Sequence, residues 1–207
     1  MSVEAERLIR AARHLAARGL SPGSSGNLSV RIGSRVLITP TGSSLSRVES
    51  GDLAEVSLED GGATSGTPSK EFPLHLAVYR QRPRATAVVH LHSPYATAIS
   101  CLPPDGQGAA ALPPLTPYRV MRFGDVPLAP YAAPGSAELA LGVERLAGRA
   151  SALLLAQHGS VVAGESIDAA VDLAEELEAA AQVTLLVAGR NPRMIPPDQL
   201  PLLRPPS

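Results

Sequence analysis

The sequence predicts a layered α/β domain. Short apolar stretches typical of strands occur between longer amphipathic stretches typical of helices, and the chain contains no internal repeat. Its 207 residues suit a single domain and are enough to bury a substantial core. We therefore expect helices packed against a sheet.

The first part of the chain is predicted to hold one helix followed by short strands. Residues 2–18 carry apolar side chains at three- and four-residue spacing, and Gly19 follows as a C-cap. A Gly-Ser turn at 33–34 separates two strand-like stretches. We expect strands at residues 27–32, 35–39 and 53–58, with a loop over 59–69.

The middle of the chain is predicted to pair a helix with a short apolar strand. Residues 71–82 are predicted to be helical, with Pro73 in the first turn, where its missing N–H costs little. Residues 86–92 are predicted to form a strand and 94–101 a helix. Residues 102–134 are rich in Pro and Gly, and we expect short strands near 115–118 and 126–128.

The last part of the chain should contain the longest helix. It covers residues 166–188, with Ser166 as N-cap and Gly189 as the stop. Before it we expect a helix at 136–147 and strands at 152–156 and 161–162. The Pro-rich residues 191–207 predict an extended arm. We therefore divide the chain into a domain over 1–190 and an arm over 191–207.

Composition excludes several classes of protein. The formal charge of −1 argues against a nucleic-acid-binding protein. The apolar stretches are far too short to span a bilayer, so no membrane partner is expected. No apolar leader opens the sequence, and the single Cys101 cannot form an internal disulfide. We expect a cytoplasmic protein.

The lysine content limits one class of mechanism. Lys70 is the only lysine, so a Schiff-base mechanism has one candidate.

Three histidines have spacings that favour a metal site. His90 and His92 lie on one face of a strand, with Cα atoms roughly 6.5–7 Å apart. His158 follows a buried strand, at a point where a side chain can leave the core. Three neutral imidazoles with an open position would suit catalytic Zn²⁺, although another divalent metal could also bind. A structural role for this histidine pair is the alternative.

Glu71 is the carboxylate most suited to act beside such a metal. It begins a helix, where it could transfer a proton or occupy a coordination position. The alternative is a charge that complements the helix dipole. His75 shares its helix face and is expected to be a packing histidine with satisfied hydrogen bonds. His14 is expected to be solvated.

Three loops carry groups that could bind an anion. Each combines hydroxyl or amide side chains with glycine or precedes a helix, so together they could hold a phosphate. None has the spacing of a nucleotide-binding loop, and each alone could be a plain turn. The residues concerned are Gly26, Asn27, Thr41, Gly42, Ser69 and Lys70.

The motifs occur in an order that resembles the class II aldolase/adducin family. They are Ser-Gly-Asn-Leu-Ser-Val-Arg (25–31), Thr-Pro-Thr-Gly (39–42), Pro-Ser-Lys-Glu-Phe-Pro-Leu-His (68–75), Val-His-Leu-His-Ser (89–93) and His-Gly (158–159). The resemblance covers about residues 5–190. One departure is Gln157, where relatives often carry Asn before His-Gly.

The resemblance implies a three-layer α/β/α fold around a mostly antiparallel sheet, and a homotetramer with active sites at subunit interfaces. It implies Zn²⁺ held by His90, His92 and His158, with Glu71 as ligand or proton-transfer group. The three loops would then hold the substrate's phosphate. Tyr118 matches the family tyrosine that reaches a neighbouring subunit's site as a proton donor.

Within the family, the residues of these motifs are most similar to those of a branch of decarboxylases that act on 3-oxo-tetronate 4-phosphate. The resemblance therefore implies metal-dependent decarboxylation of this small phosphorylated sugar acid, through an enediolate, to dihydroxyacetone phosphate and CO₂. The spacing does not separate this reaction from aldol cleavage or 4-epimerisation of sugar phosphates such as fuculose or ribulose phosphate. A non-catalytic, adducin-like assembly module and a metal-free binding protein are further alternatives.

Overall fold

One sheet of eight strands runs through the computed structural model, which describes residues 2–105 and 108–203. The strands lie in the order β4-β3-β2-β1-β5-β8-β7-β6, and each pair is antiparallel except β6 with β7. Their bounds are Asn27–Ile32 (β1), Arg35–Ile38 (β2), Ala54–Ser57 (β3), Ala63–Ser65 (β4), Ala87–Leu91 (β5), Leu128–Ala129 (β6), Ala152–Leu155 (β7) and Gly159–Gly164 (β8).

Serine side chains begin several of the helices. Ser2, Ser136 and Ser166 each accept a hydrogen bond from the backbone N–H three residues ahead, which satisfies one otherwise unpaired helix donor. The α-helices are Val3–Ala17 (α1), Phe72–Gln81 (α2), Pro94–Ser100 (α3), Pro117–Phe123 (α4), Ala137–Ala147 (α5), Ile167–Leu186 (α6) and Leu200–Leu203 (α7), with a 3₁₀ turn at Ser50–Asp52.

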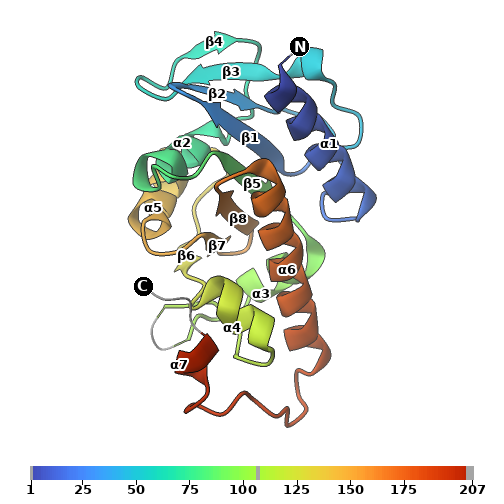
Figure 1. Ribbon diagram of the computed structural model, residues 1–207, viewed down its shortest axis with the longest axis vertical. Helices are drawn as coiled ribbons and strands as arrows, with labels where there is room; N and C mark the ends of the chain where they lie inside the picture. Colours follow the sequence, from blue (N-terminus) through green and yellow to red (C-terminus); the bar gives the residue numbers. More distant parts are fainter. Residues whose placement is uncertain (1, 106–107, 204–207) are drawn as a thin grey trace.

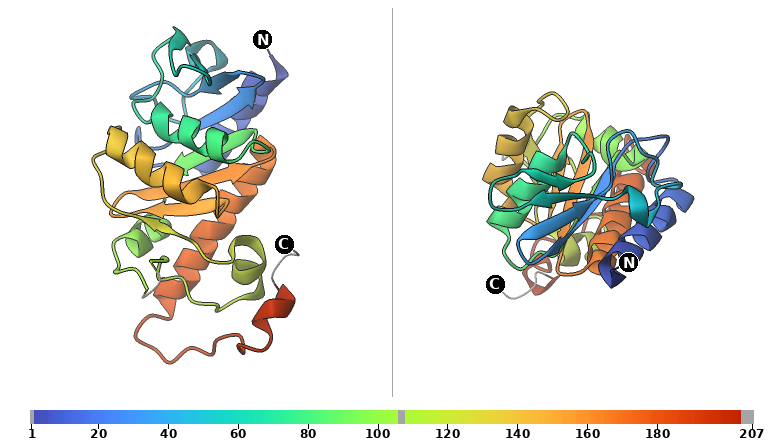
Figure 2. Two further views of the ribbon diagram at one scale, coloured as in Figure 1. Left: turned by 90° about the vertical axis from the view of Figure 1, so that its left-hand side faces the viewer. Right: turned by 90° about the horizontal axis from the view of Figure 1, so that it is seen from above.

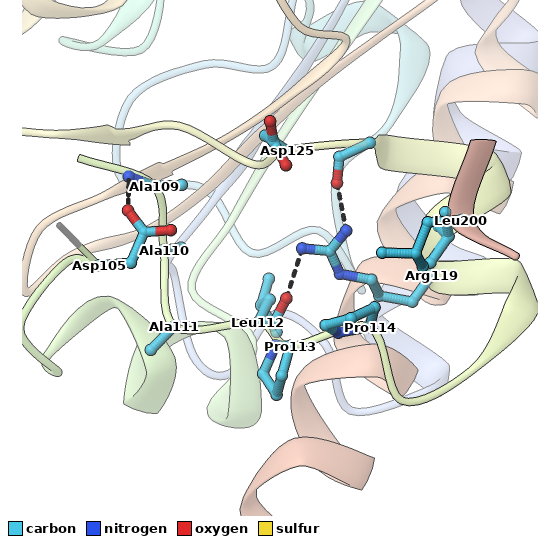
Figure 3. Close-up of a pocket in the computed structure, with 12 residues that line it drawn as sticks. Asp105, Ala109, Ala110, Ala111, Leu112, Pro113, Pro114, Arg119, Asp125 and Leu200 are labelled. Carbon is cyan, nitrogen blue, oxygen red and sulfur yellow. Dashed lines mark hydrogen bonds between the residues drawn. The ribbon is translucent and has the colours of Figure 1, made fainter. Parts of the chain in front are cut away.

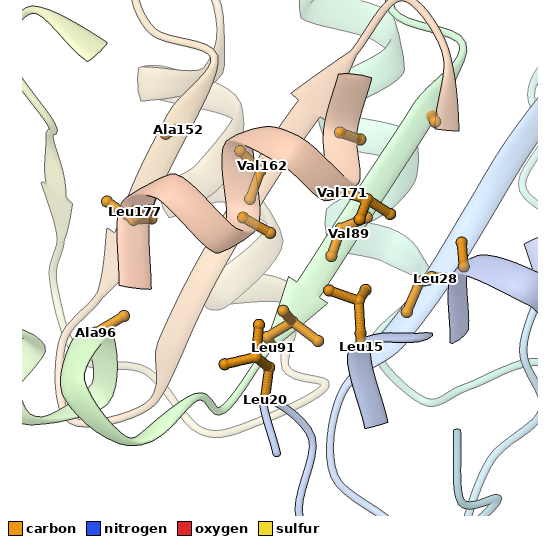
Figure 4. Close-up of a cluster of buried hydrophobic side chains, with 14 of the residues drawn as sticks. Leu15, Leu20, Leu28, Val89, Leu91, Ala96, Ala152, Val162, Val171 and Leu177 are labelled. Carbon is orange, nitrogen blue, oxygen red and sulfur yellow. The ribbon is translucent and has the colours of Figure 1, made fainter. Parts of the chain in front are cut away.

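Helices cover both faces of the sheet and give three layers. Helices α1, α3 and α6 lie on one face, and α2 and α5 lie side by side on the other (Figures 1 and 2). A hydrophobic core lies on each face of the sheet, and side chains alternate between them along β5. Val89 and Leu91 pack in the core with α1, α3 and α6, whereas Val88 packs in the core with α2 and α5. Figure 4 shows Val89 and Leu91 together with Leu15 of α1. The expected α/β/α arrangement with a mostly antiparallel sheet is confirmed.

Two local predictions were wrong. Residues 115–118, expected to be a strand, contain the start of α4, because Thr116 accepts from the Arg119 N–H and Pro117 occupies the first turn. The expected loop over 59–69 contains the short strand β4, which pairs with the edge of β3 and whose residues are all exposed.

The C-terminal segment folds back against the stretch before α4. The Ile195 N–H donates to the Pro114 carbonyl at 3.0 Å, and α7 contacts α4. Figure 3 shows Leu200 beside Arg119 in a pocket there, where Arg119 donates to the Gly124 and Leu112 carbonyls. The expected arm therefore contains a short helix. No helix within the described part of the chain is both long and apolar enough to cross a membrane.

Candidate metal centre

Four side chains from separate segments of the chain meet near the end of β5. His90 lies in β5, and His92 follows the last residue of that strand. His158 lies in the connection between β7 and β8, and Glu71 is the N-cap residue of α2. Their ligand-type atoms all lie within 4.8 Å of one another. The structure therefore brings together the four residues that the sequence suggested for a metal.

Strand geometry explains why three imidazoles converge. His90 and His92 lie two and four residues after Val88, so their side chains are on the same face of the strand as Val88. That face packs against α2 and carries Glu71, so both rings point toward Glu71. Gly159 begins β8 beside the end of β5, where an added Cβ would lie only 2.2 Å from the Leu91 carbonyl oxygen. Only glycine permits this approach, which places the preceding His158 next to His92.

The donor atoms have the spacing of a small coordination sphere. The Nε2 atom of His92 lies 3.1 Å from Nε2 of His90 and 3.1 Å from Nε2 of His158. The two carboxylate oxygens of Glu71 lie 3.1 Å from Nε2 of His90 and 3.1 Å from Nε2 of His158. Donors about 2.0–2.1 Å from a tetrahedral zinc ion are separated by roughly 3.3–3.4 Å. The cluster fits an ion of that size with little movement.

The surroundings of His90 and His158 favour metal binding. His90 is fully buried and its Nδ1 lies 2.8 Å from the Ser160 carbonyl oxygen, so in the neutral ring that binds a metal Nδ1 donates to this oxygen and Nε2 presents a lone pair to the cluster. His158 Nδ1 is buried and has no hydrogen-bond partner among the described residues. Converging lone pairs repel one another unless a proton or a cation lies between them, and a divalent ion satisfies all of them at once.

Burial and mutual charge set the ionisation of the cluster. Burial by itself raises the pKa of Glu71, but hydrogen bonds and charge from His158 and His90 outweigh it and hold the pKa well below its ordinary value. Burial, followed by the charges of His90 and His158, lowers the pKa of His92 to about 4. An ionised carboxylate and a neutral imidazole at pH 7 are the forms that bind divalent metals.

Asn27 is tied to the centre more closely than its expected phosphate role suggested. Its Nδ2 donates to Glu71 Oε2 at 3.1 Å, and its Oδ1 accepts from His75 Nε2 at 2.5 Å. His75 is a packing histidine with both ring nitrogens bonded, as expected, because Ser29 Oγ lies 2.7 Å from its Nδ1. The sequence held a signal for this group, since Asn27 and Ser29 share a strand face and Glu71 and His75 share a helix face.

The three anion-type loops lie next to one another. The Leu28 N–H donates to Thr39 Oγ1 at 3.2 Å, which joins the end of the Gly26-Asn27 loop to the next loop. The Thr41 N–H donates to the Thr67 carbonyl at 3.2 Å, and the Ser69 N–H donates to the Thr39 carbonyl at 3.2 Å.

The predicted loop residues differ in exposure. Thr41, Gly42 and Lys70 are exposed, whereas Ser69 is buried, with its Oγ accepting from the Glu71 N–H at 3.3 Å. Gly26 has a φ of +77°, and an added Cβ would lie 2.9 Å from the His90 carbonyl oxygen, so this position requires glycine. The first and third loops thus contact Glu71 through hydrogen bonds from Asn27 and to Ser69.

Three further residues from the sequence analysis are not among the four that cluster. Tyr118 is on α4 and is 66% exposed, and it is not one of the four clustered residues. His14 is exposed on α1 and forms an ion pair with Glu175 at 2.8 Å, which agrees with a solvated role. Gln157 has an exposed side chain and a φ of +58°, in the left-handed region.

Comparison with known proteins identifies the family. Residues 6–185 match the Class II Aldolase and Adducin N-terminal domain. The chain belongs to the class II aldolase/adducin family. The 3-oxo-tetronate 4-phosphate decarboxylase of Pectobacterium atrosepticum is 44% identical over 185 residues, which cover 88% of this chain and 84% of that protein. The crystal structure of YgbL from Klebsiella pneumoniae matches with a TM-score of 0.91 and 41% identity, covering 97% of both chains.

A sugar-phosphate aldolase of the family is a more distant relative. The L-fuculose phosphate aldolase of Haemophilus influenzae is 33% identical over 199 residues, which cover 94% of this chain and 89% of that protein. Similarity to the decarboxylase is thus greater than similarity to this aldolase. Since proteins named for either activity are similar to this chain over most of its length, the fold alone does not select the reaction.

Proposed function

We propose that this protein is a metal-dependent carboxy-lyase that converts 3-oxo-tetronate 4-phosphate to dihydroxyacetone phosphate and CO₂. The observation that carries the proposal is the 44% identity to a decarboxylase of that name, over most of a chain that retains His90, His92, His158 and Glu71 as one cluster. An enzyme of this class needs to stabilise electron density released from a breaking carbon–carbon bond.

The reaction places two demands on the site. The bond between C1 and C2 breaks, C1 leaves as CO₂, and the electron pair left on C2 delocalises onto the 3-oxo oxygen before a proton adds to C2. His90, His92, His158 and Glu71 would hold a divalent ion, for which we propose Zn²⁺, and the chemistry it would supply there is Lewis-acid stabilisation of developing negative charge. The protein supplies the ligands, the orientation of the substrate and the proton.

Glu71 is proposed to hold the ion or to transfer the proton. Its carboxylate lies 3.1 Å from the Nε2 atoms of two imidazoles, and its contacts with these rings hold its pKa well below the ordinary value. Burial by itself favours the protonated form, so the pKa of this carboxyl depends on the groups that contact it, which suits a role in proton transfer. Tyr118 is the second proposed proton donor and would act in a neighbouring subunit, since it is exposed on its own chain.

The phosphate is proposed to bind the joined loops. Backbone N–H groups at Gly26 and Gly42, the hydroxyls of Thr41 and Ser69, and the Lys70 ammonium would be donors to it. Asn27 completes the predicted set, but its side-chain amide is already engaged by Glu71 and His75, so we assign it chiefly to the carboxylate. Binding the phosphate away from the reacting bond would orient the substrate.

We further propose a homotetramer with active sites between subunits, a catalytic domain over residues 1–190 and a C-terminal arm over 191–207. The exposure of Tyr118 supports the assembly, and α7 of the arm contacts α4 of the domain. The arm would then modulate the position of α4, the helix that carries Tyr118.

Aldol cleavage is the second candidate, supported by the 33% identity to an L-fuculose phosphate aldolase. Both reactions leave an electron pair beside a carbonyl, so they differ in which bond is aligned with the carbonyl π system. Epimerisation of a pentulose phosphate at C4 uses the same principle. A non-catalytic, adducin-like role is disfavoured by the intact cluster of four ligands.

The deciding experiment is incubation of the purified protein, loaded with Zn²⁺, with 3-oxo-tetronate 4-phosphate and separately with fuculose and ribulose phosphates. We expect CO₂ and dihydroxyacetone phosphate from the first and no aldehyde from the others. Aldehyde formation without CO₂ would establish the aldolase instead.

A further inference from the structure

A chain of buried polar side chains continues from Glu71 into the protein, away from the three metal-binding histidines. Beyond the contact of Asn27 with Glu71, His75 Nε2 lies 2.5 Å from Asn27 Oδ1 and His75 Nδ1 lies 2.7 Å from Ser29 Oγ. Ser29 Oγ is in turn 2.8 Å from the hydroxyl of Tyr79. All five side chains are buried, and those of Ser29 and His75 are completely so.

The Glu71 carboxylate fixes the direction of every hydrogen bond in this chain. A carboxylate only accepts, so Asn27 must turn its NH₂ group toward Glu71 and its oxygen toward His75. The oxygen also only accepts, so His75 must carry its proton on Nε2. Burial lowers the pKa of His75 to about 3, so the ring is neutral and its Nδ1 accepts. Ser29 therefore donates to His75, and Tyr79 donates to Ser29.

We propose that His75, oriented by Ser29 and Tyr79, is a positioning residue that locks the Asn27 amide with its NH₂ group on Glu71 and so fixes that carboxylate at the metal centre. Nothing else among the described contacts holds the Asn27 side chain. If the amide rotated by half a turn, its oxygen would face the carboxylate and its NH₂ group would face the Nε2–H of His75. Both contacts would be repulsive in a buried site, where an unpaired polar group is costly.

Loss of the orientation of Asn27 would affect the Glu71 carboxylate rather than the three imidazoles. Glu71 Oε2 lies between Asn27 Nδ2 and His90 Nε2, at 3.1 Å from each. Loss of the amide donor would free Glu71 to rotate away from His90 and would weaken the metal site. Removing comparable partners behind metal ligands lowers metal affinity or activity by roughly 10–100-fold.

Two substitutions at one position separate the hydrogen bond from packing. His75→Leu removes both ring nitrogens, whereas the amide of His75→Gln can still donate to Asn27 from a position near that of Nε2. We expect the affinity for Co²⁺ alone, titrated into metal-free protein, to fall by roughly 10–100-fold in His75→Leu and to be largely restored in His75→Gln. The matched control is Val143→Ala, a fully buried change in the α2–α5 core, which should lower thermal stability without changing Co²⁺ affinity.

The tautomer of His75 provides a test that does not depend on any variant folding. In metal-free wild-type protein labelled with ¹⁵N-histidine, we expect NMR at pH 7 to show a neutral His75 ring with the proton on Nε2. A proton on Nδ1 would overturn the proposal, as would unchanged Co²⁺ affinity in a folded His75→Leu protein. Equal losses in His75→Leu and His75→Gln would also overturn it, since packing alone would then explain both.

The role of these hydrogen-bonded side chains in turnover rests on the proposed function, but the Co²⁺ and NMR measurements use no substrate. A protein with the expected tautomer and Co²⁺ affinities that releases no CO₂ from 3-oxo-tetronate 4-phosphate would contradict the decarboxylase proposal only. Conversely, normal CO₂ release by His75→Leu would contradict the positioning role and leave the decarboxylase proposal intact.

Discussion

At the residue scale, the behaviour of the site depends on Glu71. Its backbone begins α2, its Oε2 accepts from Asn27, and its two oxygens face two of the three clustered imidazoles. Burial and hydrogen bonding act on its pKa in opposite directions, and the hydrogen bonds prevail. A group balanced in this way is suited to change its protonation when neighbouring ligands change.

We expect Glu71→Gln to lower kcat by roughly 10²–10⁴, because an amide cannot accept and deliver a proton as a carboxyl group can. The shape of the side chain is preserved, so phosphate affinity should be retained. The measurement is CO₂ release under saturating substrate, with circular dichroism as the check on folding. Near-normal turnover would remove Glu71 from proton transfer.

The backbone of Gln157, next to His158, is locally strained. Its φ of +58° is unfavourable for a residue with a long side chain, whereas Asn adopts this region more readily. We expect Gln157→Asn to raise the free energy of unfolding by about 0.5–1 kcal/mol, since left-handed backbone costs about 1–2 kcal/mol for most residues. Urea denaturation of the metal-free proteins measures this. A decrease in stability would show that the Gln157 side chain makes a contribution that offsets its backbone.

At the element scale, the site is made where strand ends and one helix start coincide. The end of β5, the connection from β7 to β8 and the N-terminus of α2 each contribute ligands. Their alignment depends on close packing of β8 against β5, where Gly159 leaves no room for a Cβ beside the Leu91 carbonyl.

Gly159→Ala is therefore expected to displace the start of β8 and lower metal affinity at least tenfold, the lower end of effects seen when groups supporting metal ligands are removed. The control is Gly142→Ala in α5, where the added Cβ meets only Ala129 Cβ at 3.9 Å. That change should stabilise the helix by about 1 kcal/mol and leave metal binding unchanged. Zinc competition with a chromophoric chelator measures both affinities. Equal zinc affinities in the two variants would contradict this role of Gly159.

Sequence patterns predicted most elements because their signals are local. The amphipathic spacing of α1 and the Ser166 cap of α6 each lie within a few residues of the element they specify. Strand β4 carried no such signal, since its residues are exposed and its conformation comes from pairing with β3. The prediction of a strand at the start of α4 was wrong, because a Thr followed by Pro also indicates the start of a helix.

The site was predictable in its ligands but not in its supporting contacts. His-x-His on a strand places two rings on one face by local geometry, whereas the contact of His75 with Asn27 joins residues 48 positions apart. The adjacency of the three loops likewise depends on backbone hydrogen bonds between segments that are distant in the sequence, such as Ser69 to Thr39. Such contacts follow from the order of strands in the sheet, which local patterns do not specify.

At the scale of the whole molecule, the two helical layers protect a set of buried groups that tolerate protonation poorly. His75 is fully buried with its pKa lowered to about 3 by burial, against about 6.5 for an unfolded chain. The unfolded state therefore binds this proton more readily, so its contribution makes stability fall as the pH drops below 6.5.

We expect metal-free protein to lose about 1.4 kcal/mol of stability from His75 alone between pH 7.5 and 5.5, with a further loss down to about pH 3. Urea denaturation at these pH values measures the change. A free energy of unfolding that stays constant from pH 7.5 to 5.5 would contradict a neutral, buried His75.

The proposed assembly has a test in subunit mixing. If Glu71 and Tyr118 act in one site from different subunits, inactive Glu71→Gln and Tyr118→Phe proteins should complement each other when unfolded and refolded together. Random assembly would give about a quarter of wild-type activity, because half of the subunits supply each intact residue. Light scattering should report a tetramer. No recovery of activity in mixed assemblies of confirmed composition would place both residues in the same subunit's site or exclude Tyr118.

The central claim is that His90, His92, His158 and Glu71 form one divalent metal centre. The most direct measurement is anomalous diffraction from crystals of the Zn²⁺-loaded protein, with data collected on both sides of the zinc absorption edge. We predict one strong anomalous peak per chain, bounded by the three histidine Nε2 atoms. A peak elsewhere, or none at this cluster, would contradict the account.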